Sequence, residues 1–131
     1  NDVNRNQVSQ SYYTVTGDIS ESDLGNDHNV AVDALTIGIP LITSGNLGST
    51  IFFRNTGADG NNVLVVSPKN TNKIIGGMTQ ASAVFHASGV AGKDVINTKA
   101  TSKKGDWIAL RAVSLTEWYI IGGQGIWASE S

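Results

Sequence analysis

The chain contains no cysteine among its 131 residues, which excludes disulfide frameworks, thiolate metal sites and cysteine nucleophiles. Charge is also scarce, because 15% of the residues are charged, against about 25% in typical globular domains. The chain has nine Lys and Arg and eleven Asp and Glu, which gives a net charge of −2. This charge argues against a nucleic-acid partner, because binding to phosphates needs concentrated positive charge. No apolar run reaches the roughly 18 residues of a membrane helix, so we expect no membrane insertion.

Groups suited to catalysis are few. The two histidines, His28 and His86, lie far apart in unlike contexts, and an isolated histidine on a strand is more often hydrogen-bonded or exposed than a general base. The chain has no Gly-x-Ser-x-Gly elbow and no His-Glu-x-x-His motif. The Gly-Gly-Gln-Gly at residues 122–125 precedes no predicted helix, so we interpret it as a turn rather than a phosphate-binding loop. The sequence therefore predicts a protein that is not an enzyme and uses no cofactor.

An acidic stretch offers the best candidate for a metal site, because hard cations bind several converging oxygen ligands. Its members are Asp18, Glu21, Asp23, Asp27 and His28. The spacing of Asp23, Gly25 and Asp27 resembles the start of a calcium loop, but the bidentate glutamate at its twelfth position is absent. We favour a solvated turn with Asx hydrogen bonds and expect no metal. The basic residues Lys93, Lys99, Lys103 and Lys104 are likewise interpreted as solvated loops.

Short apolar runs, separated by turn residues, recur every eight to fifteen residues, and none shows a sustained helical period. They cover residues 12–16, 30–39, 50–54, 63–66, 73–75, 81–87, 94–101, 107–113 and 118–121. This pattern predicts an all-β fold, namely an antiparallel sandwich, a jelly roll or a β-prism. Residues 30–131 form the predicted domain, and residues 1–29 an arm or edge segment. The start at Asn1 rather than Met indicates a processed product or a fragment.

Turn chemistry gives two further expectations. The Asp59-Gly60 pair between residues 55 and 62 predicts a hairpin loop. Positive φ is expected at most of four glycines, each of which follows an apolar run: Gly57, Gly60, Gly76 and Gly105.

Aromatic residues near the C-terminus are the candidates for an interface or a ligand contact: Trp107, Trp118, Tyr119 and Trp127. Trp118 shares a strand face with Ile120 and is expected to fill the core. Trp127 follows a glycine run and precedes a polar end, so we expect it to pack against a neighbouring subunit. The run at residues 63–66 is apolar on both faces, and its second face predicts a homotrimer interface.

Several segments are similar to strand-and-turn series of bacteriophage tail-fibre, spike and other virion surface proteins. They are GSTIFFRNTGADG at residues 48–60, NVLVVSP at 62–68, NKIIGG at 72–77, NTKATSKKGDWIAL at 97–110, EWYII at 117–121 and GIWA at 125–128. The resemblance covers roughly residues 33–128. It implies a virion role, an all-β fold and homotrimer assembly, and it transfers no ligand residue, because the shared positions are structural.

Three functions agree with these observations. The first is a fibre or spike domain on the virion surface that attaches the particle to its host, with other virion proteins and a host glycan or receptor as partners. The second is a capsid-decoration protein that binds over subunit junctions. The third is a bacterial carbohydrate-binding module in which Trp107 or Trp127 forms a stacking platform.

Overall fold

The computed structural model describes residues 8–80 and 83–130, and this part of the chain is all-β. Its strands are β1 (Gln10–Tyr13), β2 (Gly17–Asp18), β3 (Asp27–Val30), β4 (Leu35–Gly38), β5 (Thr50–Asn55), β6 (Leu64–Ser67), β7 (Lys73–Ile75), β8 (Gly77–Gln80), β9 (Ala83–His86), β10 (Val95–Asn97), β11 (Trp107–Ser114), β12 (Glu117–Gln124) and β13 (Trp127–Ser129). In this part of the chain, the short 3₁₀ helices η2 (Glu21–Asp23) and η3 (Lys99–Thr101) lie in connections. Within the described residues, no helix is long and apolar enough to cross a membrane.

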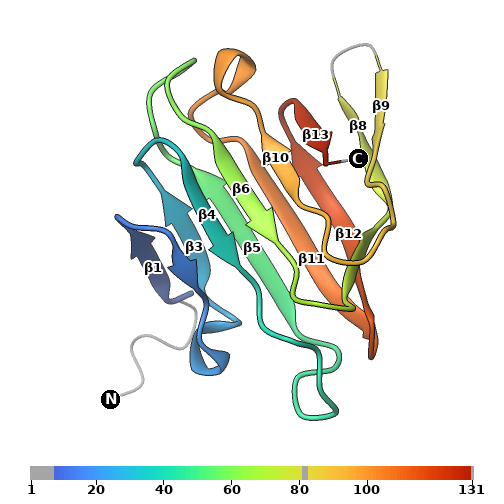
Figure 1. The fold of residues 1–131 in the computed structure, drawn as a ribbon. Coiled ribbons are helices and arrows are strands. Elements are labelled where there is room, and N and C mark those ends of the chain that lie inside the picture. The colour runs from blue at the N-terminus through green and yellow to red at the C-terminus, as the bar shows by residue number, and fades with distance from the viewer. Residues whose placement is uncertain (1–7, 81–82, 131) are drawn as a thin grey trace.

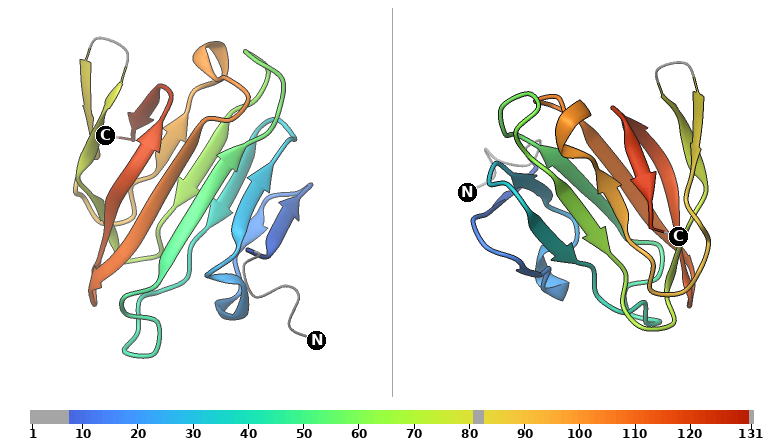
Figure 2. Two further views of the ribbon diagram at one scale, coloured as in Figure 1. Left: turned by 180° about the vertical axis from the view of Figure 1, so that it is seen from behind. Right: turned by 45° about the horizontal axis from the view of Figure 1, so that its top comes forward.

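The strands form two main sheets that face each other (Figure 1). The six-stranded sheet has the order β1-β3-β5-β11-β12-β7, and the five-stranded sheet has the order β13-β10-β6-β4-β2. Strands β8 and β9 form a separate hairpin beside β12 and β13. Viewed from behind, the six-stranded sheet faces the reader (Figure 2). The buried apolar side chains of both sheets form one core cluster, which includes Ile37, Phe53, Leu64, Leu110 and Trp118.

The sheets are mixed, so the prediction of an antiparallel sandwich is wrong in that respect. Among the described residues, five strand pairs are parallel and five are antiparallel. From β1 to β6 the chain alternates between the two sheets, and neighbours within each sheet run in the same direction. A parallel pair needs a crossover connection, and here a strand of the opposite sheet is part of each crossover.

This alternation also corrects two local predictions. The loop at residues 55–62 is not a hairpin, because it joins β5 in one sheet to β6 in the other. The apolar run at residues 30–39 is not one strand but belongs to β3 and β4, which lie in different sheets. Ala34, with a φ of 65°, lies in the connection between them. A third correction concerns Gly122 to Gln124, which continue β12 rather than form a turn.

Three of the four expected turn glycines have positive φ, which confirms the turn prediction. The φ angles are 71° at Gly60, 97° at Gly76 and 98° at Gly105. Gly57 does not have a positive φ. A glycine is needed at this position because the side chain of Asn62 occupies the place that a Cβ would take.

A buried polar chain joins the two sheets at one end of the core. Asn55 in β5 donates from Nδ2 to Oδ1 of Asn97 in β10 over 2.8 Å. Asn97 in turn donates to Oδ2 of Asp106 over 3.1 Å, and the same carboxylate oxygen accepts from the backbone N–H of Lys103 over 2.9 Å. These bonds satisfy polar groups that would be costly to bury alone.

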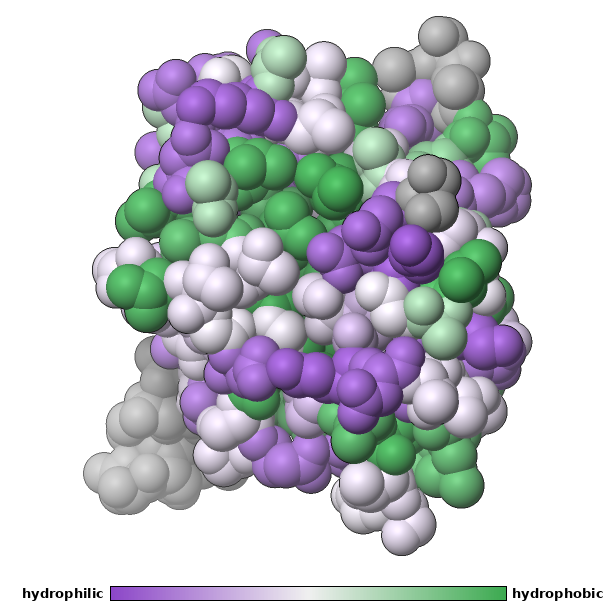
Figure 3. All heavy atoms as spheres, viewed as in Figure 1, coloured by the Kyte–Doolittle hydropathy of each residue, from purple (hydrophilic) through white to green (hydrophobic). Residues whose placement is uncertain are grey.

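The outer face of the five-stranded sheet carries a row of mostly apolar side chains. Thr36, Val65, Ile96 and Ala128 are aligned across β4, β6, β10 and β13 by the strand registers. All four side chains are half-buried. Figure 3 shows hydrophobic side chains gathered on the upper part of this face. We call these four residues the apolar row.

Candidate binding site

The outer face of the six-stranded sheet presents aromatic and planar polar side chains in register. Tyr12 on β1 is opposite Asn29 on β3, Asn29 is opposite Arg54 on β5, Arg54 is opposite Trp107 on β11, and Trp107 is opposite Gln124 on β12. Alternate residues of a strand point to opposite sides, so these positions share the face turned away from the core. We call these five residues the cross-strand row.

Aromatic rings pack closely at the middle of this face. Phe52 and Trp107 stack with ring centroids 5.0 Å apart and planes inclined by 15°. The guanidinium of Arg54 lies over Phe52, with Cζ 4.7 Å from the ring centroid, a geometry that attracts a cation to the ring. The far edge of the Trp107 indole lies 3.0 Å from the position that a Cβ on Gly122 would take. Gly122 therefore makes room for the indole in the middle of a strand.

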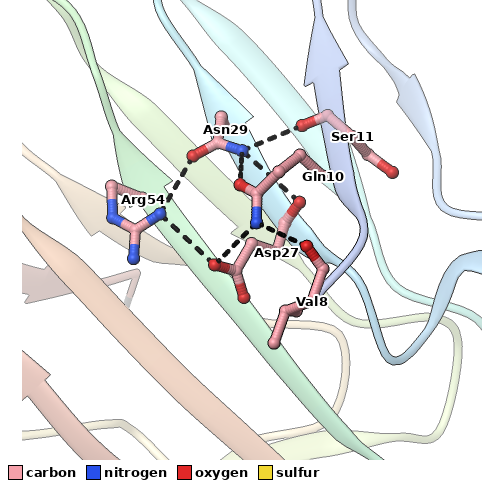
Figure 4. Close-up of polar contacts among 6 residues, drawn as sticks. All are labelled: Val8, Gln10, Ser11, Asp27, Asn29 and Arg54. Atoms are coloured by element: carbon pink, nitrogen blue, oxygen red, sulfur yellow. Dashed lines mark hydrogen bonds and ion pairs between the residues drawn. The ribbon is translucent and has the colours of Figure 1, made fainter. Parts of the chain in front are cut away.

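Next to the aromatic stack, four polar side chains hold one another in place (Figure 4). Nη1 of Arg54 donates to Oδ1 of Asn29 over 3.2 Å and to Oδ2 of Asp27 over 3.4 Å. Nε2 of Gln10 donates to the same Asp27 oxygen over 3.2 Å and to the carbonyl of Val8 over 3.1 Å. Nδ2 of Asn29 donates to Oε1 of Gln10 over 2.9 Å. Arg54 is thus shared by the polar cluster and the aromatic stack.

The four aromatic residues proposed from the sequence separate into two pairs. Trp107 and Tyr119 are half-buried on the outer face of the six-stranded sheet. Trp118 and Trp127 are almost completely buried, with exposed fractions of 0% and 2%. The expectation that Trp118 fills the core is confirmed.

The expectation for Trp127 is wrong, because its ring is covered by its own chain. Its indole N–H donates to the carbonyl of Gln124 over 3.0 Å. Its backbone N–H donates to Oε1 of Gln80 over 2.7 Å, and Nε2 of Gln80 donates back to its carbonyl over 3.2 Å. The glycine run that suggested a flexible approach is a regular part of β12, and the chain reverses at Gly125 to place β13 against β10.

Of the polar members of the site, the sequence pointed only to Asp27, and to that residue as a candidate metal ligand. Gln10, Asp27, Asn29 and Arg54 come from three strands and converge only when β1, β3 and β5 pair. The sequence contained a partial indication that Arg54 faces outward. Thr50 and Arg54 are polar, and they alternate with the apolar Ile51 and Phe53 along the strand.

The acidic stretch does not converge on one point. Asp18 pairs with Lys69 over 2.7 Å, and Glu21 accepts a hydrogen bond from Asn46 over 2.8 Å. Asp27 belongs to the polar cluster of the outer face. In residues 8–80 and 83–130 there is no group of three or more His, Asp or Glu side chains placed to hold a metal ion.

The two histidines lie in different surroundings. His86 is exposed on β9. His28 is buried under the six-stranded sheet, between the rings of Tyr13 and Phe53, and its Nδ1 lies 2.6 Å from the Tyr13 hydroxyl. Burial lowers the pKa of His28, and the backbone of Asp23 and Leu24 and the nearby carboxylates oppose this shift without cancelling it. Burial, together with the nearby carboxylate of Asp23, also raises the pKa of Tyr13. The tautomer of the imidazole determines which of the two groups donates in their hydrogen bond.

The buried imidazole makes stability dependent on pH. Because the pKa of His28 is lower in the folded state than the value of about 6.5 expected in the unfolded chain, the unfolded state binds more protons between the two pKa values. The free energy of unfolding is therefore expected to be greatest above the pKa that His28 has in the unfolded chain. It should fall as the pH decreases toward the pKa of His28 in the folded state.

Urea unfolding at pH 7.5, 6.5, 5.5 and 5.0 measures this decrease in the free energy of unfolding. His28→Phe should flatten this dependence, and the exposed His86→Gln control should not. Equal slopes for wild type and His28→Phe would contradict the assignment.

Comparisons with known proteins give no identification. No protein-family model matches the chain, and no curated protein matches its sequence.

Proposed function

We propose that the chain is a non-catalytic domain of a fibre or spike on the surface of a virus particle, where it attaches the particle to its host and assembles as a homotrimer. The observation that supports this most directly is that the two sheets have unlike outer faces. The five-stranded sheet presents the apolar row, whereas the six-stranded sheet presents the cross-strand row of aromatic and polar side chains. A spike requires both surfaces, one for its own copies and one for a ligand.

The apolar row supports assembly of several copies of the chain. Val65 and Ile96 are opposite each other on neighbouring central strands, and both are half-buried in a single chain. An apolar patch on a soluble protein commonly marks an interaction site. We propose that a second copy of the chain covers this row. The resemblance of residues 33–128 to virion surface proteins implies trimers. A trimer with closed symmetry also buries such a patch on every copy.

The assembly can be tested through the apolar row. Wild-type protein should elute with a mass three times 13.8 kDa in size-exclusion chromatography with light scattering. Val65→Lys and Ile96→Lys should reduce the mass to one chain, because each places a charge in the proposed interface. Val113→Lys is the matched control, since Val113 is 52% exposed at the outer face of the other sheet. A monomeric wild type at micromolar concentration, or a Val65→Lys trimer, would exclude the proposed interface.

Attachment itself is tested with the labelled protein and a panel of intact Gram-negative and Gram-positive bacteria. Saturable binding to at least one strain, lost in Trp107→Ala but kept in Val113→Ala, is the expected result. Absence of binding to every strain, together with stable binding to virus capsids, would replace the attachment function with capsid decoration.

A further inference from the structure

We propose that the cross-strand row binds an uncharged saccharide chain that lies across the strands of the six-stranded sheet. This inference rests on the proposed attachment function and specifies the class of ligand. The row consists of Tyr12, Asn29, Arg54, Trp107 and Gln124, one residue from each of five neighbouring strands.

The chemistry of the row matches that of a sugar chain. A pyranose ring has C–H groups that pack on an aromatic face and hydroxyl groups that need both donors and acceptors. Trp107 with Phe52 offers the aromatic surface, and Tyr12, which is 75% exposed, offers a second ring at the edge of the sheet. The exposed side chain of Gln124 has both a donor and an acceptor, and the guanidinium of Arg54 adds donors. Asn29 is buried, and its amide positions Arg54 and Gln10.

The length of the row suits an oligosaccharide better than a single sugar. Adjacent strands are about 4.8 Å apart, so four spacings from β1 to β12 extend over about 19 Å. The exposed members, Tyr12 and Gln124, lie at its two ends. Several sugar rings in line can therefore contact the row at once.

The middle of the row is ordered before any ligand arrives. Arg54 is held from one side by Asp27 and Asn29 and from another by the ring of Phe52. Gln10 closes the cluster through its bonds to Asp27 and Asn29. Side chains that are already fixed lose little conformational entropy on binding, which favours affinity for a weakly interacting polar ligand.

The charges of the site favour an uncharged ligand over an acidic one. The one cation in the row, Arg54, is paired with Asp27 over 3.4 Å, and both side chains are partly shielded, with 33% and 21% of their surface exposed. A carboxylate or phosphate on the ligand would have to compete with Asp27 for the guanidinium and would approach a like charge. Uncharged hydroxyl groups meet no such penalty.

The test uses a glycan array that contains uncharged, uronate-containing and sialylated oligosaccharides, followed by titration of the best oligosaccharide with intrinsic tryptophan fluorescence. Trp118 and Trp127 are buried, so a ligand-dependent change should come from Trp107. Trp107→Ala and Arg54→Ala are expected to weaken binding at least tenfold, whereas Trp107→Phe keeps a ring and should lose less. Val113→Ala, on the same sheet but outside the row, should bind like the wild type. Melting temperatures measured in parallel identify any variant that fails to fold.

The outcomes separate the ligand class from the attachment function. Binding to uncharged glycans, with cell binding that periodate destroys, supports the inference. Cell binding that survives periodate but is lost after protease treatment of the bacteria overturns the saccharide and leaves attachment in place. Preference for acidic glycans, or glycan binding unaffected by Trp107→Ala and Arg54→Ala, overturns the site as described. Absence of both glycan and cell binding overturns the saccharide and the attachment function together.

Discussion

Replacement of Trp118 by alanine is expected to lower the free energy of unfolding by about 3–5 kcal/mol. The indole is completely buried and belongs to the main core cluster. Its neighbours in register are the small Ala112 on β11 and Ile74 on β7. The short side chain of Ala112 cannot fill the space, so we expect the variant to retain a cavity and to lose the transfer free energy of the ring.

Urea unfolding followed by far-ultraviolet circular dichroism measures this effect. Trp118→Phe is the informative control, because the indole N–H has no hydrogen-bond partner among the described residues. Phenylalanine keeps most of the apolar contact and removes a buried unsatisfied donor, so its cost should be less than half that of alanine. A loss below about 1 kcal/mol for Trp118→Ala would contradict complete burial of the ring.

Replacement of Trp127 by alanine should also lower the free energy of unfolding by about 3–5 kcal/mol, and it should do so without dissociating an oligomer. The ring is buried in its own chain, and its backbone forms a pair of hydrogen bonds with Gln80 of β8. Alanine keeps these backbone bonds, so the loss of stability comes from the core and from the indole bond to the carbonyl of Gln124.

Thermal melts at low and high protein concentration, with the mass measured in parallel, distinguish the two roles of Trp127. A loss of stability equal at both concentrations, with an unchanged mass, is expected. Trp127→Phe should recover most of the stability but not the indole bond to the carbonyl of Gln124. A Trp127→Ala variant with wild-type stability and a smaller mass would restore the interpretation of a subunit contact.

One residue of the cross-strand row, Trp107, was identified as a contact residue from the sequence. Trp107 and Tyr119 were identified as contact residues because large aromatic side chains near polar turns favour interfaces, and both lie on the outer face of the six-stranded sheet. For Arg54, the sequence indicated only a polar residue near the end of a strand in which polar and apolar residues alternate. Its role depends on Asp27 and Asn29, which belong to a different strand, and on Gln10, which belongs to a third.

The sequence alone determined the all-β class, most strand positions and the burial of Trp118, because these depend on local pattern. A strand period of two and the preference of glycine for positive φ act within a few residues. Only the tertiary structure decided that β1 to β6 alternate between two sheets, that half of the strand pairs are parallel and that Trp127 lies inside. Those features depend on which distant strands become neighbours. A strand with alternating polar and apolar residues has nearly the same sequence pattern whichever strand it pairs with. The packing of the whole core therefore determines which strands become neighbours.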